Sequence, residues 1–190
     1  MALQNNQRYL GGGRLYFERL VDGVLQEKKE IGEVKDFKIT ANVETADVET
    51  FEGAFPATVD SIVTKQNYSI SFTTNQVDKD TLLLALFGEV TQKTYNQGDT
   101  LPDGSTATGG ETYNIIDVGM FDNIQGRVTF VSTPARGKKK VVVFNKVALT
   151  TNGDIVLQSR EFVTVGFTGK VLEDGSVTEG SKFFRVYEEA

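Results

Sequence analysis

Apolar and polar residues alternate with a period of two along several stretches of the chain. In residues 36–44 the odd positions are apolar, whereas in residues 67–73 the even positions are apolar. Successive side chains of a strand point to opposite faces, so both stretches predict strands with one apolar and one polar face. Residues 127–131 and 162–167 repeat this style and are rich in Val, Phe and Thr. Such strands are typical of antiparallel sheets that are covered on one side.

Four Asp-Gly or Asn-Gly pairs occur along the chain: Asp22-Gly23, Asp103-Gly104, Asn152-Gly153 and Asp174-Gly175. Between apolar runs, such pairs are strong signals for hairpin turns. The first, third and fourth pairs predict turns between strands. The second lies in residues 96–110, a stretch rich in Gly and Thr that predicts a loop.

One segment, residues 78–88, has helical rather than strand periodicity. Asp78 or Asp80 can cap its start, and Gly88 can end it. A helix this short is marginal alone, so we expect it to lay an apolar side on the sheet. The expected core side consists of Leu82, Leu83, Leu86 and Phe87.

Strands and turns therefore make up most of the chain, with a single helix and no internal repeat or linker. This pattern predicts an all-β protein, an antiparallel β-sandwich with one short α-helix packed on it. Residues 1–13 are expected to form an N-terminal arm that ends at the glycines 11–13. Residues 14–190 are expected to form one domain with an extended loop near 89–126.

Composition argues against most catalytic chemistry. The 190 residues include no His and no Cys, which excludes a Ser-His-Asp triad, a thiol nucleophile and a zinc ribbon. Carboxylates are dense between residues 27 and 52, yet solvated strand faces explain them more simply than a hydrolase cleft does. We expect no enzyme activity and no cofactor or metal.

The charge and hydropathy of the chain bear on its surroundings. The net charge of −6 argues against a dedicated duplex-binding surface. The longest apolar run, residues 82–87, is far shorter than the ~20 residues that span a bilayer. The N-terminal octet is polar, so neither a membrane segment nor a secretory signal is expected.

Two groups of residues are candidates for contacts between subunits. Arg136, Lys138, Lys139 and Lys140 form a basic cluster, which is either a solvated turn or a patch for an acidic neighbour. Phe51 and Phe55 lie in a stretch expected to be a loop, residues 45–57. They either anchor an interface or fold back on their own core.

The order of these segments resembles that of a known family. A hairpin at residues 14–31 leads into Ile31-Gly-Glu-Val, then to Tyr68-Ser-Ile-Ser-Phe and the Leu-rich helix at 80–88. Thr133-Pro-Ala-Arg-Gly-Lys and a terminal Phe183-Phe-Arg-Val-Tyr follow. This order resembles the tail tube (major tail) proteins of long-tailed bacteriophages over residues 14–88 and 127–187.

The resemblance implies a structural virion protein, assembled in the host bacterial cytoplasm. Hexameric rings would share an inner β-barrel and stack into the tail tube, the conduit for genome ejection. Its partners would be copies of itself, a tape-measure protein and the tail tip and terminator proteins, while phage DNA passes without sequence-specific binding. The expected lumen lining is the polar face of the two alternating strands: Lys38, Thr40, Asn42, Glu44, Asn67, Ser69, Ser71 and Thr73.

Two alternatives stay open. The polar strand faces could lie outside the tube rather than in its lumen. The chain could also be a monomeric β-sandwich binding module, carbohydrate-binding or adhesin-like, which would need clustered aromatic residues on a flat or concave face.

Overall fold

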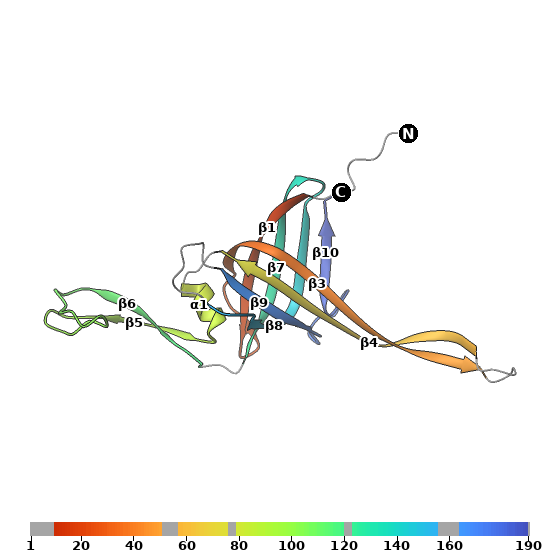
Figure 1. The fold of residues 1–190 in the computed structure, drawn as a ribbon, viewed down its shortest axis with the longest axis horizontal. Helices are drawn as coiled ribbons and strands as arrows, with labels where there is room; N and C mark the ends of the chain where they lie inside the picture. The colour runs from red at the N-terminus through yellow and green to blue at the C-terminus, as the bar shows by residue number, and fades with distance from the viewer. Residues whose placement is uncertain (1–9, 51–56, 76–78, 120–122, 156–163, 190) are drawn as a thin grey trace.

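The computed structural model describes residues 10–50, 57–75, 79–119, 123–155 and 164–189 (Figure 1). The expectation of a mostly antiparallel β protein with one short helix is confirmed. The elements in chain order are β1 (Leu10–Val21), β2 (Val24–Leu25), β3 (Lys29–Thr50), β4 (Ala57–Thr74), α1 (Lys79–Ala85), β5 (Glu89–Thr94), β6 (Thr112–Asp117), β7 (Ile124–Arg136), β8 (Lys140–Thr151), β9 (Val165–Leu172) and β10 (Phe184–Glu188).

The main sheet closes on itself. Its strand order is β10-β8-β7-β1-β3-β4-β9, and β8 also pairs with β9. In place of the predicted sandwich of separate sheets, the body is thus one hydrogen-bonded sheet folded over a core. The reason lies in the length of β8: residues 140–144 pair with β10, and residues 146–151 pair with β9. A Cβ at Gly169 of β9 would lie 2.6 Å from Val147 Cγ1, so only glycine permits this approach.

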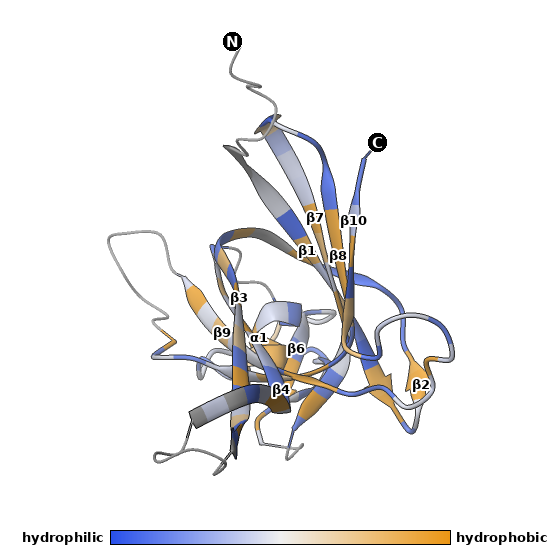
Figure 2. Ribbon diagram, turned by 90° about the vertical axis from the view of Figure 1, so that its right-hand side faces the viewer, coloured by the Kyte–Doolittle hydropathy of each residue, from blue (hydrophilic) through white to orange (hydrophobic). Residues whose placement is uncertain are grey.

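The core lies inside the closed sheet, where apolar residues of alternate positions meet. Leu15, Val128 and Phe144 are fully buried, and apolar segments alternate with polar ones along the strands (Figure 2). The alternation predicted for β4 is confirmed, because Ile70 and Phe72 are buried. Along β3 the apolar side chains become exposed beyond residue 38, where the strand leaves the body.

Helix α1 packs on the sheet through a different side from the one expected. Thr81 and Ala85 are buried, and Phe87 packs against the core as predicted. The predicted core residues Leu82, Leu83 and Leu86 are only half-buried, because the small side chains at 81 and 85 face the body and let the helix approach it closely.

The left-handed residue that ends the helix is Phe87, one position before the predicted Gly88. Phe87 adopts a left-handed conformation with φ 53°, and the Gly88 N–H donates to the Leu83 carbonyl at 3.0 Å. Glycine is needed at position 88 for another reason. A Cβ there would lie 2.9 Å from the Asp117 carbonyl oxygen of β6.

Two stretches expected to lack regular structure are strands. The expected loop near 89–126 contains β5 and β6, which pair in register from Glu89–Asp117 to Thr94–Thr112. Residues 10–13, expected to end a flexible arm, pair with β7 instead. Residues 1–9 of the expected arm lie outside the described residues.

Two hairpins project from the body in opposite directions (Figure 1). The β5–β6 hairpin points one way along the longest axis, and the far part of the β3–β4 pair points the other way. We call this β3–β4 pair the ribbon. Its two strands, of 22 and 18 residues, are paired from Val34–Thr74 out to Thr50–Ala57.

Candidate functional site

The polar-face residues predicted from the alternation come together on one face of the ribbon. The register places three predicted pairs directly opposite one another: Lys38 with Ser71, Thr40 with Ser69, and Asn42 with Asn67. Glu44 lies opposite Lys65, and Thr73 lies opposite Lys35. Directly opposed residues of a pair share a face, so all eight predicted side chains form one surface.

This surface continues onto β9, which the sequence analysis missed. Thr168 and Lys170 lie opposite Ser71 and Ser69, and they border a shallow groove of about 360 Å³ that Asn42 also lines. Period-two alternation in residues 165–171, where the odd positions are apolar or glycine, predicts this strand and the polar face that includes Thr168 and Lys170. The strand predicted from the sequence ends at residue 167.

The polar face carries both lysines and a carboxylate. The Lys65 ammonium and the Glu44 carboxylate form an ion pair at 3.0 Å, with both side chains more than half exposed. Lys38 and Lys170 are also exposed. Lysines therefore outnumber carboxylates among these four residues, and such a face attracts phosphate rather than repelling it.

The predicted basic cluster forms the turn between β7 and β8. Lys140 forms an ion pair within the chain, because its Nζ lies 3.1 Å from Glu188 Oε2. Its backbone N–H also donates to Ser132 Oγ at 2.6 Å. Within the described ranges, the exposed side chains of Arg136, Lys138 and Lys139 form no ion pair with a carboxylate.

The stretch 45–57, expected to be a loop, is mostly the outer part of the ribbon. Strand β3 runs to Thr50, and β4 begins at Ala57. Phe51 and Phe55, the predicted interface anchors, lie outside the described residues. Among the described residues of the ribbon, five large apolar side chains are exposed: Ile39 at 40%, Val43 at 50%, Val48 at 40%, Ile62 at 54% and Val63 at 48%. Ile39 and Val43 belong to the apolar face predicted for residues 36–44, whereas the sequence analysis did not single out the other three.

The tip of the β5–β6 hairpin, residues 95–111, is a compact turn rather than an open loop. Tyr95 and Ala107 are buried within it. The Glu111 carboxylate accepts hydrogen bonds from the backbone N–H groups of Thr108 (2.9 Å) and Gly109 (2.8 Å) and from the Thr108 hydroxyl. These bonds, the Thr108 hydroxyl first, lower the pKa of Glu111 to about 2. These hydrogen bonds tie residues 108–111 of the tip together.

A cleft lies between β1, β3 and α1. It has a volume of about 400 Å³ and an apolar floor that includes Phe17, Ile31 and Leu84. At its wall, the Lys29 ammonium lies 2.7 Å from Asp80 Oδ1, so this carboxylate is already paired.

In the described part of the chain, no three His, Cys, Asp or Glu residues are grouped as metal ligands would be. No described helix is both long enough and apolar enough to cross a membrane.

A family profile matches residues 8–115, which is more than half of the chain. The family is described as "Protein of unknown function UCP028589". The chain belongs to this family. The matched region of UCP028589 covers the ribbon, α1, β5 and part of β6. No curated protein matches the chain.

Proposed function

We propose that this chain is a structural subunit that assembles with copies of itself into stacked hexameric rings, the tail tube of a bacteriophage. The observation that carries the proposal is the outer part of the ribbon, which projects from the body (Figure 1). This part exposes apolar side chains. In a monomer these apolar side chains stay exposed to water, whereas a subunit can cover them with a neighbour.

The energetics of the ribbon favour coverage. An isolated two-stranded ribbon is marginally stable in water, and three or more strands or a packed face are needed for independent stability. Ile62 and Val63 are about half exposed. Covering the remaining half of such a side chain contributes on the order of 1 kcal/mol. Several such contacts in each subunit, repeated around a ring, would favour assembly.

The sheet also has an edge that suits assembly. Among the described strands, β10 pairs with β8 alone, and its Val186 and Tyr187 are exposed. An open edge strand invites pairing with another chain. Pairing of successive copies around a closed ring would remove the open edges and build the shared inner barrel that the resemblance implies.

The tube assignment draws on the resemblance of residues 14–88 and 127–187 to tail tube proteins, and on the grouping of the eight polar residues. In this proposal the polar face lines the lumen, and DNA passes it without base recognition. Because Lys38 and Lys170 lie on this face, DNA transit should slow at low salt. A tape-measure protein and the tip and terminator proteins would be the other partners.

Electron microscopy of the purified full-length chain across a concentration series tests the proposal. Mass measurement by light scattering on the same samples gives the number of subunits. We expect rings of six that stack into hollow tubes as concentration rises. A monomer at every concentration would contradict the proposal.

A second function is favoured by the cleft beside α1. Its apolar floor and charged rim are typical of a small-ligand site. In this case the chain is a monomeric binding module. A screen for ligands that raise the melting temperature would then give hits that substitution of the floor residue Leu84 removes.

A further inference from the structure

We infer that the outer part of the ribbon docks on the basic end of a second copy of the chain. The outer ribbon is residues 45–50 of β3 with residues 57–63 of β4. The basic end is the β7–β8 turn with the adjoining strand β10. This inference rests on the proposed self-assembly and names the two surfaces that meet.

The first argument is a change in the ribbon's faces at a β-bulge. Up to the pair Glu44–Lys65, one face of the ribbon is polar. The register then shifts, so that Thr45 lies opposite Val63 and Ala46 lies opposite Ile62. Neighbouring pairs point to opposite faces. The polar face therefore continues into Ala46–Ile62, while the other face continues into Thr45–Val63.

Both faces of the outer ribbon consequently carry an exposed apolar residue. Ile62 is 54% exposed on one face, and Val63 is 48% exposed on the other. A ribbon that merely extended into solvent would keep its polar face to the end. The loss of that face beyond the bulge indicates that this segment is covered on both sides in the assembled state.

The second argument is charge. The outer ribbon carries Asp47, Glu49 and Asp60, all exposed. In the described part of the chain, no Lys or Arg forms an ion pair with these three carboxylates. Glu44, just inside the bulge, differs because Lys65 pairs with it. The outer ribbon thus presents negative charge that no described Lys or Arg neutralises by an ion pair.

The basic end complements both features. Arg136, Lys138 and Lys139 are exposed cations without a carboxylate partner among the described residues. Strand β10 beside them exposes Val186 at 56% and Tyr187 at 51%. An acidic surface with apolar residues in one copy therefore meets a basic surface with apolar residues in the next.

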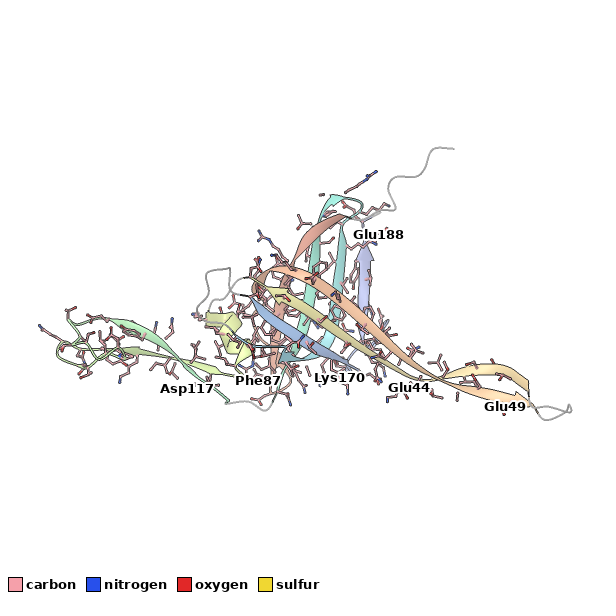
Figure 3. The ribbon with its side chains drawn as sticks, viewed as in Figure 1. Glu44, Glu49, Phe87, Asp117, Lys170 and Glu188 are labelled. Atoms are coloured by element: carbon pink, nitrogen blue, oxygen red, sulfur yellow. The ribbon has the colours of Figure 1, made fainter. Side chains whose placement is uncertain are left out.

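The contact has to form between copies. Glu49 near the ribbon's end and Glu188 beside the basic turn lie on different projections of the molecule (Figure 3). The ribbon points away from the body, so it cannot fold back to its own basic end without breaking its pairing. Because the two surfaces differ, the contact is head-to-tail, which is the kind that builds rings or filaments.

Cysteine trapping tests the inference directly, because the chain has no native Cys. We would mix Asp47→Cys protein with Lys138→Cys protein under assembly conditions and add a short bis-maleimide cross-linker. We expect a covalent dimer between the two variants. Glu179→Cys, at an exposed position between β9 and β10, mixed with Lys138→Cys is the matched control and should give little product.

Charge reversal gives a second readout. Asp47→Lys with Asp60→Lys should raise the concentration needed for assembly about tenfold, because two of the exposed charges at the contact are reversed. Lys138→Glu with Lys139→Glu should do the same. A mixture of these two proteins should assemble better than either alone, because each supplies the charge that the other has lost.

The outcomes separate this inference from the proposed function. Rings without the Asp47–Lys138 cross-link would overturn the inference and leave self-assembly standing. A chain that stays monomeric and gives no cross-link would overturn both. If the Lys138→Glu variant still yields rings but loses binding to duplex DNA, the basic end is a nucleic-acid contact, and the inference is wrong.

Discussion

Two isoleucines of β4 permit a sharp test of the ribbon, because the same substitution should act on different equilibria at the two sites. Ile70 is 1% exposed within the core, whereas Ile62 is 54% exposed on the outer ribbon. We would replace each with threonine. Threonine keeps the β-branch and hence the strand preference, so the comparison isolates burial.

The expected magnitudes follow from these exposures. At Ile70, threonine removes buried apolar groups at about 0.8 kcal/mol per methylene and buries a hydroxyl at about 1–3 kcal/mol. We expect Ile70→Thr to lower the free energy of unfolding by roughly 3 kcal/mol. At Ile62 the hydroxyl reaches water in the monomer, so unfolding should change by less than about 0.5 kcal/mol. Assembly should lose about 1 kcal/mol per contact, roughly a fivefold weaker association.

Urea denaturation followed by far-ultraviolet circular dichroism measures the first quantity, and light scattering across a dilution series measures the second. Wild-type protein and a Lys79→Gln variant, changed at an exposed residue of α1, serve as controls. If Ile62→Thr destabilised the monomer as much as Ile70→Thr does, the outer ribbon would pack within its own chain. If Ile62→Thr assembled at the wild-type concentration, the ribbon would not be a contact.

Three further predictions concern other parts of the molecule. The folded-state pKa of Glu111 is lowered to about 2, so its contribution to the order of the hairpin tip should be complete above pH 4.5 and lost as pH falls through 2. Amide hydrogen exchange of the tip across this pH range, with Glu111→Gln as the reference, measures this loss. Exchange rates that do not change with pH relative to the reference would contradict the prediction. Gly88→Ala should lower the melting temperature by several degrees, because its Cβ would meet the Asp117 carbonyl; calorimetry finding no change would show that β6 moves aside freely. Lys38→Ser with Lys170→Ser should reduce the salt dependence of DNA binding to assembled rings, and an unchanged slope in a filter-binding assay would place the polar face outside the lumen.

The alternation in the sequence predicted the strands around residues 36–44 and 67–73 and the face that their polar residues share. Alternation is a local property, so it identifies a strand wherever one face is apolar and the other is polar. It failed beyond Glu44, where apolar residues occur on both faces of the paired strands. The sequence there was interpreted as a loop, although the strands continue to Thr50 and from Ala57.

The helix illustrates a second limit. Its leucines have helical spacing, which was enough to predict a helix and the packing of Phe87. Which side is buried depends on β8, a strand more than fifty residues away, where the Thr151 hydroxyl donates to the Ala85 carbonyl. Such contacts favour the small residues Thr81 and Ala85 against the sheet, and no local pattern indicates them. The closure of the sheet through β8 and β9 is non-local in the same way.

The closure of the sheet also sets the order in which the chain can fold during synthesis. Strand β1 cannot form its pairing with β7 until that strand, more than a hundred residues later, has been synthesised. The sheet closes only when β9 is made and pairs with β8. The ribbon needs only its own two strands, so it can form while the ribosome is still adding the rest. Non-local pairings of this kind fold slowly. In the proposed assembly, the surface that receives the ribbon of another copy would therefore be completed only when β10 is made, so polymerisation would wait until synthesis is finished.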